Sequence, residues 1–200
     1  MTVAAVVVAG GAARRFGGID KLTVCVDGMP VLARVLTALR GLPADEVVVV
    51  GPRRPGVDDG CVVVRESPPG GGPLAAIAAG LAALGEGERV GDVVVVVAGD
   101  LPHLTPEALG VLVERLAASP SCGVAMATDD GGRAQYLLAA WRREVLLSRL
   151  AAVGDPVGQA VRTLTRGVEV ELVEIPVGPA GQAPWQDLDE RPGSVDSPQT

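Results

Sequence analysis

The sequence is poor in aromatic residues, in lysine and in histidine. Among its 200 residues there are two tryptophans, one tyrosine and one phenylalanine, and the single histidine is His103. Sixteen of the seventeen basic residues are arginine, so Lys21 is the only lysine in the chain. A composition that supplies positive charge as arginine nearly everywhere directs attention to the segment that holds this one lysine.

Cysteine is also scarce. The three cysteines, Cys25, Cys61 and Cys122, are odd in number, lie far apart and form no Cys-x-x-Cys pair. This pattern indicates neither a disulfide framework nor a zinc site. We expect buried free thiols that act as small apolar side chains.

Basic residues are fewer than acidic ones, 17 against 24. The net charge is -7 and the isoelectric point is near 4.7, which argues against general nucleic-acid binding because that needs a basic surface. Residues 3–9 form an apolar stretch that is too short for a membrane span and lacks the basic lead-in of a signal peptide. We therefore expect a cytoplasmic protein that binds neither nucleic acid nor membranes, with any anion site confined to one locality.

Short apolar runs alternate with helical patterns along the chain. Uninterrupted runs rich in valine are typical of strands buried on both faces of a parallel sheet, and residues 30–42 place apolar side chains on one helix face. Strand alternating with helix predicts a three-layer α/β/α fold with a mostly parallel central sheet. The expected strands are 3–9, 47–50, 61–64, 93–98, 123–127 and 136–141, and the expected helices are 30–42, 73–84, 105–118, 144–153 and 157–164.

The length suits one large domain. We assign residues 1–190 to it, and we expect residues 191–200, within a stretch rich in proline, glycine and aspartate, to form a frayed tail. In α/β sheets ligands bind where the strands end. The loops that follow the strands are therefore the places to look for function.

The loop after the first strand matches neither of two familiar phosphate-binding loops. A P-loop needs Gly-Lys-Ser/Thr in succession, whereas Lys21 follows Asp20 and precedes Leu22. The dinucleotide fingerprint G-x-G-x-x-G is absent as well, which leaves an oxidoreductase without support.

This loop nevertheless carries the means to bind phosphate in another way. Gly10 and Gly11 let the backbone approach a base or ribose closely, and Arg15 and Lys21 can reach phosphate oxygens from two sides. Lysine is a compact, mobile point charge that can follow a phosphoryl group as its oxygens rearrange, which the planar arginine fork does less well. The alternative is an ordinary glycine-rich turn, including Gly17-Gly18, with a solvated charge cluster.

Asp100 follows an apolar run of five valines and Ala98-Gly99. A carboxylate projecting from the carboxyl edge of a sheet is a plausible Mg²⁺ ligand, since Mg²⁺ takes one or two carboxylates, waters and substrate phosphates. The alternative is a turn or cap aspartate, because Gly-Asp-Leu-Pro is a good turn. We interpret His103, three residues further on, as a loop residue without a catalytic role.

The segment "VAGGAARRFGGIDK" (8–21) resembles the signature of molybdenum cofactor guanylyltransferases, the MobA-like nucleotidyltransferases, with valine for the initial leucine. "GGGPLAAIAAGL" (70–81), with Ala76 for a glycine, "VVVAGDLPHLTPEAL" (95–109) and "GRAQYLLAAWRREV" (132–145) are similar to further segments of that family. The resemblance covers roughly residues 3–190. It implies a Rossmann-like nucleotidyltransferase fold and a magnesium-dependent enzyme.

The resemblance also implies roles for individual residues. Backbone groups of Val8, Ala9 and Gly10, with Gly11 beside them, would hold the guanine, and Arg15 and Lys21 would bind the triphosphate. Glu66 falls where the family has an acidic residue near base and ribose, and Gly51 falls where a close relative carries asparagine. Asp100 corresponds to the magnesium-binding aspartate, and Arg15, Lys21 and Asp100 would form the catalytic set.

A second metal ligand is expected near the end of the chain. Family members carry an Asn or Asp pair before Thr-Pro there, and this sequence has "WQDLDERPGSVD" (185–196). Asp187 and Asp189 would face the same side of an extended segment. We select Asp189 as the ligand and Asp187 as its alternative, against a solvated acidic tail.

The reaction implied is attack by the terminal phosphate of molybdopterin on the α-phosphate of GTP, with release of pyrophosphate. The partners implied are GTP, a phosphorylated pterin acceptor, and a molybdoenzyme or cofactor-insertion protein. Enzymes of the same class are alternatives: a cytidylyltransferase for molybdopterin, a guanylyltransferase for a phospho-lactate type acceptor, or a sugar-nucleotide enzyme. A nucleotide-binding accessory protein without turnover is the alternative from another class.

Overall fold

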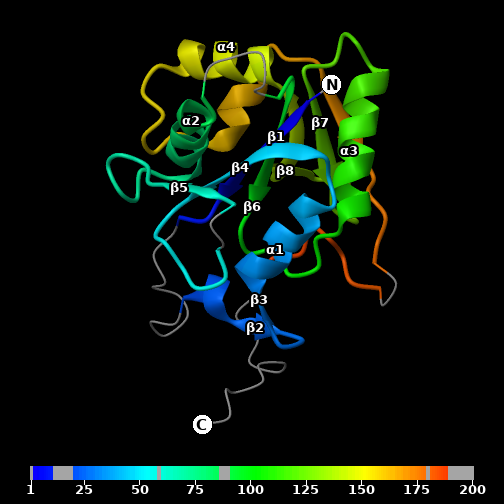
Figure 1. Cartoon of the computed structure of the whole chain (residues 1–200). Helices are drawn as coiled ribbons and strands as arrows, with labels where there is room; N and C mark the ends of the chain where they lie inside the picture. Colours follow the sequence, from blue (N-terminus) through cyan, green and yellow to red (C-terminus); the bar gives the residue numbers. More distant parts are fainter. Residues whose placement is uncertain (1, 11–19, 58–59, 86–90, 179–180, 189–200) are drawn as a thin grey trace.

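The computed structural model describes residues 2–10, 20–57, 60–85, 91–178 and 181–188. Its centre is a seven-stranded sheet in the order β5-β4-β1-β6-β8-β7-β9 (Figure 1). A two-stranded hairpin, β2–β3, stands apart from this sheet. The strands are β1 (Val3–Val8), β2 (Cys25–Val26), β3 (Met29–Pro30), β4 (Ala44–Val50), β5 (Val62–Val64), β6 (Val93–Ala98), β7 (Val124–Thr128), β8 (Ala134–Arg142) and β9 (Val170–Val173).

Six of the seven strands of the main sheet run in one direction. β1 pairs in parallel with β4 and with β6, so that Val7 lies opposite Val49 on one side and Val97 on the other. β8 runs antiparallel to both of its neighbours, β6 and β7. The prediction of a mostly parallel central sheet is therefore confirmed.

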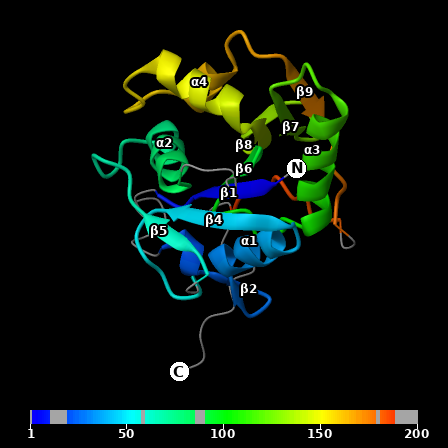
Figure 2. The ribbon, with the colours of Figure 1, turned by 45° about the horizontal axis from the view of Figure 1, so that its top comes forward.

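Helices cover both faces of the sheet. α1 (Val31–Arg40) and α3 (Pro106–Ala118) pack on one face, and α2 (Pro73–Ala83) and α4 (Arg143–Val153) lie on the other, as Figure 2 shows. Successive side chains of a strand point to opposite faces, so β1 contributes Ala5 and Val7 to one core and Ala4 and Val6 to the other. Strands buried on both faces explain why the sequence shows unbroken valine runs, and the predicted three-layer α/β/α architecture is confirmed.

The predicted helix over residues 157–164 is wrong. Residues 157 and 158 form a turn, and a 3-10 helix, η3 (Val161–Thr165), follows. Gly158 has a φ of +70°, outside the helical region, and its N–H donates to the carbonyl of Gly71 at 2.8 Å. A contact with a distant segment thus prevents the local helix. The strand β9 and the hairpin β2–β3 were not predicted.

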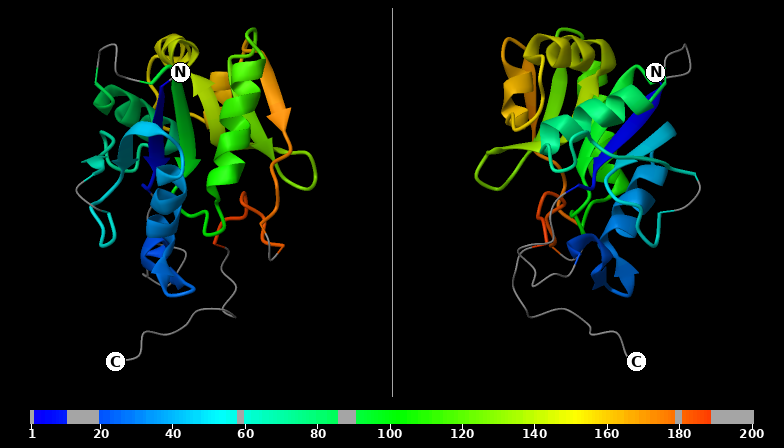
Figure 3. Two further views of the ribbon diagram at one scale, coloured as in Figure 1. Left: turned by 45° about the vertical axis from the view of Figure 1, so that its right-hand side comes forward. Right: turned by 90° about the vertical axis from the view of Figure 1, so that its left-hand side faces the viewer.

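The fold brings four loops to one edge of the sheet. The chain leaves β1, β4, β5 and β6 at this carboxyl edge, because these neighbouring strands are parallel. The segment after β9, orange to red in Figure 3, runs to the same end of the molecule and lies beside the loop that follows β6 in both panels. Segments far apart in the sequence therefore meet here. Within the described ranges, no helix is both long enough and apolar enough to cross a membrane.

Two glycines in helices offer a matched test of the packing. A Cβ at Gly80 of α2 would lie 2.4 Å from Cγ1 of Val6, whereas a Cβ at Gly110 of α3 would meet no heavy atom within 4 Å. We expect Gly80→Ala to lower the free energy of unfolding by about 1–3 kcal/mol through overpacking. We expect Gly110→Ala to raise it by up to about 1 kcal/mol, since alanine favours the helix. Urea unfolding of both variants checks this, and a stabilised Gly80→Ala would contradict it.

Candidate active site

The carboxyl edge of the sheet carries glycines and charged residues in the loops that follow the strands. Gly10, Gly51 and Asp100 each stand one or two positions beyond the strands β1, β4 and β6. Glu66 stands two positions beyond β5. Three polar or charged residues in the described part of the chain are buried, and two of them, Arg54 and Glu66, lie in the loops at this edge.

Backbone hydrogen bonds extend the sheet just past the strand ends. The N–H of Ala9 donates to the carbonyl of Val50 at 2.8 Å, and the N–H of Gly99 donates to the carbonyl of Val8 at 2.9 Å. Gly10 has no hydrogen bond with another described residue. The other described segments at this edge therefore leave its N–H and carbonyl unengaged.

Glu66 has one carboxylate oxygen satisfied and one unsatisfied. Glu66 is only 6% exposed, and its Oε1 accepts a hydrogen bond from the N–H of Gly70 at 2.9 Å. Oε2 is buried and accepts no hydrogen bond from any residue that the structure describes. A Cβ placed on Gly10 would stand 3.3 Å from Oε1 and 3.6 Å from Oε2. A buried acceptor without a donor has a cost in free energy, and a ligand N–H or O–H beside Gly10 would remove it.

Lys21 and Asp100 meet at Leu188. Lys21 begins the short helix η2 (Lys21–Thr23), and its Nζ donates to the carbonyl of Leu188 at 2.9 Å. The N–H of Leu188 donates to the carbonyl of Asp100 at 3.1 Å. The structure thus brings the lone ammonium and the backbone of Asp100 to one residue of the C-terminal segment.

The surroundings of Asp100 disfavour its charge. Burial raises the pKa of the Asp100 carboxyl above its ordinary value, and the carboxylate of Asp187 raises it further. A backbone hydrogen bond and the ammonium of Lys21 act in the opposite direction, with smaller effect. The half-buried carboxylate of Asp100 and the exposed carboxylate of Asp187 repel each other, and a cation between them would relieve this repulsion.

The donors at this point suit a hard cation. Carboxylate oxygens of Asp100 and Asp187 are the ligands that Mg²⁺ prefers, and Mg²⁺ needs only one or two of them beside water and phosphate. Across the described ranges there is no group of three or more His, Cys, Asp or Glu residues placed to hold a metal.

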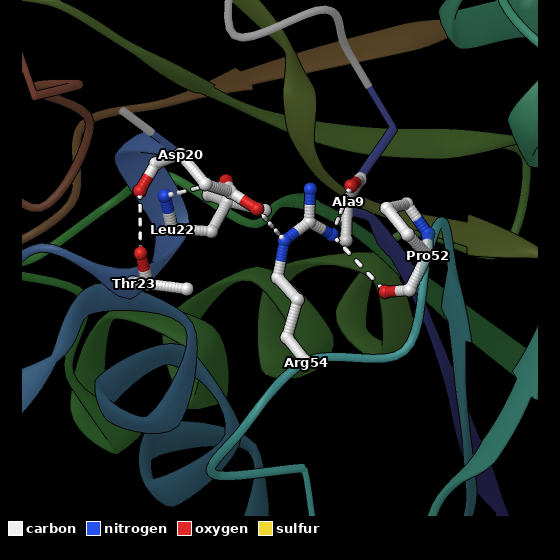
Figure 4. Close-up of polar contacts among 6 residues, drawn as sticks. All are labelled: Ala9, Asp20, Leu22, Thr23, Pro52 and Arg54. Atoms are coloured by element: carbon white, nitrogen blue, oxygen red, sulfur yellow. Dashed lines mark hydrogen bonds and ion pairs between the residues drawn. The ribbon is translucent and has the colours of Figure 1, made fainter. Parts of the chain in front are cut away.

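Arg54 is a buried cation at this edge that the sequence analysis did not select. Its guanidinium lies between the carboxylate of Asp20 and the carbonyl of Ala9, as Figure 4 shows. The position could have been noticed, because "GPRRPG" (51–56) directly follows a buried parallel strand. The pattern does not, however, indicate which of Arg53 and Arg54 turns inward.

His103 belongs to the loop after β6 and interacts with the hairpin side of the molecule. Burial and the guanidinium of Arg34 lower the pKa of His103, and Asp27 opposes them. Arg34 donates from Nε to the carbonyl of Pro102 at 2.7 Å and from Nη1 to the carbonyl of Val26 at 3.1 Å. Arg34 thereby fastens this loop to the β2–β3 hairpin, a structural role.

Several predicted site residues lie outside the described residues. They are Gly11, Arg15 and Asp189, and the expected tail 191–200 lies there as well. Their roles stay predictions. The described part of the predicted set, namely Val8, Ala9, Gly10, Lys21, Glu66 and Asp100, lies along the one edge of the sheet.

The chain is similar to known nucleotidyltransferases. The family model of the MobA-like NTP transferase domain matches residues 5–171. A probable molybdenum cofactor guanylyltransferase of Thermococcus kodakarensis is 32% identical over 184 residues, which cover 86% of this chain and 83% of the relative. A molybdenum cofactor guanylyltransferase of Rhodobacter capsulatus is 35% identical over 144 residues, covering 71% and 70%. A solved nucleotidyl transferase structure from Methanothermobacter is similar with a TM-score of 0.65 and 26% identity, covering 87% of each chain.

Proposed function

This chain belongs to the MobA-like NTP transferase family, and from that premise we propose that it transfers GMP from GTP to the terminal phosphate of molybdopterin and releases pyrophosphate. The observation that carries the proposal is the meeting of Lys21 and Asp100 at Leu188. In this proposal the ammonium of Lys21 binds phosphate and the carboxylate of Asp100 binds a metal at the same substrate. The names of the two guanylyltransferase relatives supply the base and the acceptor.

In this proposal the guanine and ribose lie against Gly10 and Glu66. The backbone of Ala9 has its N–H bonded to Val50 and its carbonyl bonded to Arg54, so Gly10 is better placed to offer backbone groups to the base. The unsatisfied Oε2 of Glu66 accepts a ligand N–H or O–H. Val8 and Ala9, with Gly11, shape the approach, and Arg15 and Lys21 bind the triphosphate.

We propose Mg²⁺ as the metal, held by Asp100 and by Asp187 or Asp189 together with the phosphates. Asp187 has the support of its electrostatic interaction with Asp100. When bound, the cation neutralises charge on the triphosphate and polarises the reacting phosphorus. The residues of the chain fit such an ion because they are hard oxygen donors that repel each other without it.

The chemical step needs no strong general base. The attacking oxygen belongs to a phosphate that is already anionic at neutral pH. It forms a bond to the α-phosphorus of GTP while the bond from that phosphorus to the bridging oxygen breaks, and the electron pair leaves with pyrophosphate. The chain contributes in-line positioning and positive charge, which Lys21 and Arg15 provide.

A screen of the four nucleoside triphosphates with candidate acceptors tests the proposal. We expect pyrophosphate release from GTP in the presence of molybdopterin and a divalent cation. We expect this release to stop when the cation is removed with a chelator. Release from CTP would favour the cytidylyltransferase alternative, and release with another phosphorylated acceptor would favour the corresponding alternative. GTP binding without release of pyrophosphate would favour the accessory-protein alternative. The presence of Gly51, where the family resemblance predicts asparagine, is the observation that supports this alternative. The product would pass to a molybdoenzyme or an insertion protein, and we propose the cytoplasm as the place.

Lys21→Arg separates turnover from binding. The guanidinium keeps the charge but cannot follow the phosphate oxygens as a compact ammonium does. We expect kcat to fall about 10²-fold, a loss typical for one transition-state donor, while the Kd for GTP changes far less. Lys21→Met, which removes the charge, should weaken both. Steady-state kinetics and calorimetry measure the two quantities, and an unchanged kcat in Lys21→Arg would refute this role.

A further inference from the structure

Arg54 reaches from the loop after β4 to two other segments. The residue is 7% exposed, and its Nε lies 2.5 Å from Oδ2 of Asp20. Its Nη1 donates to the carbonyl of Ala9 at 2.7 Å and to that of Pro52 at 3.3 Å. The guanidinium is thus shared between the end of β1 and the residue before Lys21 (Figure 4).

Asp20 connects Arg54 to the short helix that begins with Lys21. Asp20 is the N-cap residue of η2, and its Oδ1 accepts the N–H of Leu22 at 3.2 Å. Its backbone carbonyl accepts the hydroxyl of Thr23 at 2.8 Å. One carboxylate therefore holds Arg54 with one oxygen and caps the turn that begins with Lys21 with the other.

Gly51 also packs closely against the Ala9 carbonyl that Arg54 contacts. A Cβ on Gly51 would stand 2.4 Å from the oxygen of Ala9. The Ala9 carbonyl therefore lies between a glycine without a side chain and the Arg54 guanidinium. The loop after β4 fits closely against the end of β1 at this point.

We propose that Arg54 is a positioning residue: by joining Ala9 to Asp20 it sets where the Lys21 ammonium stands relative to the end of β1. This inference rests on the proposed function, because Lys21 is taken to bind the triphosphate. A planar fork can serve two acceptors on different segments at fixed directions, whereas an ammonium on a flexible stem fixes neither direction. Lysine at position 54 therefore keeps the charge and loses the positioning.

The competing explanation is a buried ion pair that only stabilises the fold. The two explanations differ in their coupling to Lys21. If Arg54 acts through Lys21, changing Arg54 matters for triphosphate binding only while Lys21 is present. If Arg54 only stabilises the fold, Arg54→Lys changes the Kd for triphosphate by the same factor, or not at all, with and without Lys21.

The test is a double-mutant cycle with Arg54→Lys and Lys21→Met. The Kd is measured for GTP and for inorganic triphosphate, without acceptor, by calorimetry. We expect Arg54→Lys to weaken binding of both probes about 10-fold in the presence of Lys21 and less than about 2-fold in the Lys21→Met background. Arg53→Lys is the matched control, because Arg53 is the exposed neighbour, and it should change nothing. Equal weakening in both backgrounds, or none in either, would overturn the proposal.

A second measurement does not depend on the ligand. The N–H of Leu22 is bonded to Asp20, so its hydrogen exchange reports on the cap that Arg54 holds. We expect it to exchange about 10-fold faster in Arg54→Lys than in Arg53→Lys, with the amides of β1 unchanged. Unchanged protection of Leu22 would count against Arg54 even if GTP binds. Faster exchange in a protein that does not bind GTP would instead contradict the proposed function and leave the positioning intact.

Discussion

Asp100→Asn is expected to lower the rate of pyrophosphate release by about 10³-fold, although the chain still folds. Asparagine has nearly the same shape as aspartate, but it offers the cation a neutral oxygen in place of a carboxylate. The loss should appear in kcat at saturating GTP and Mg²⁺. Asp45→Asn, an exposed position at the start of β4, is the matched control and should retain full activity. A variant of Asp100 with undiminished turnover would contradict the metal-binding role.

The same substitution is expected to stabilise the metal-free protein at neutral pH. Burial and then Asp187 raise the pKa of Asp100 in the folded state, so the stability that its protonated form contributes is full below the unfolded pKa, near 3.8, and is lost as the pH rises through the folded value. Asparagine cannot ionise and keeps this contribution. Urea unfolding in a chelator should therefore show an advantage for Asp100→Asn at pH 7 that shrinks toward pH 4.

Added Mg²⁺ should reverse that order. A ligand that binds only the folded state stabilises it by mass action, and only the protein with Asp100 keeps the proposed ligand pair. We expect the melting temperature of the unsubstituted protein to rise with Mg²⁺ and GTP more than that of the variant. Equal rises in both proteins would mean that the cation binds elsewhere.

Gly51→Asn is expected to damage the protein, although the family resemblance predicts asparagine at this position. A Cβ here would stand 2.4 Å from the oxygen and 2.6 Å from the carbon of the Ala9 carbonyl. Because backbone atoms cannot turn away as a side chain can, the end of β1 must shift. We expect the free energy of unfolding to fall by about 3 kcal/mol, the upper part of the range for overpacking. Urea unfolding measures this fall.

Gly51→Ala distinguishes the cause. If the Cβ is responsible, alanine costs nearly as much as asparagine, and GTP binding falls in both variants because Ala9, Gly10 and Arg54 move together. If the asparagine amide makes a favourable contact with the nucleotide, Gly51→Asn should bind GTP more tightly than Gly51→Ala. Tighter binding than in the unsubstituted chain would show that the Ala9 carbonyl yields easily.

The regular part of the fold could be predicted because its causes are local. Each expected strand overlaps an observed one, since uninterrupted apolar runs are typical of strands covered on both sides. The direction of β8 could not be inferred, because an apolar run has the same composition whichever way it runs. The helix expected at 157–164 was wrong because the N–H of Gly158 bonds to Gly71, a partner that no local pattern indicates.

Some features of the candidate site could likewise be predicted from the sequence, and others could not. Lys21 and Asp100 could be selected from a lone lysine and a strand-end acid, and the structure brings both to Leu188. Their meeting through a backbone carbonyl and N–H carries no sequence signal, since any residue type offers these groups. Arg54 was missed for a related reason: its importance depends on burial, and burial of one arginine in an Arg-Arg pair depends on how the loop turns.

The bonds of Leu188 bear on how the chain is best shortened for experiments. The family match ends at residue 171, inside β9 (Val170–Val173), whereas the backbone that holds both Lys21 and Asp100 lies seventeen residues further on. A fragment trimmed to the recognisable part of the family would keep nearly every strand and lose the bridge between lysine and aspartate. We therefore expect a fragment that ends at residue 171 to lose the contacts of Leu188 with Lys21 and Asp100, so a fragment for experiments should extend at least to residue 188.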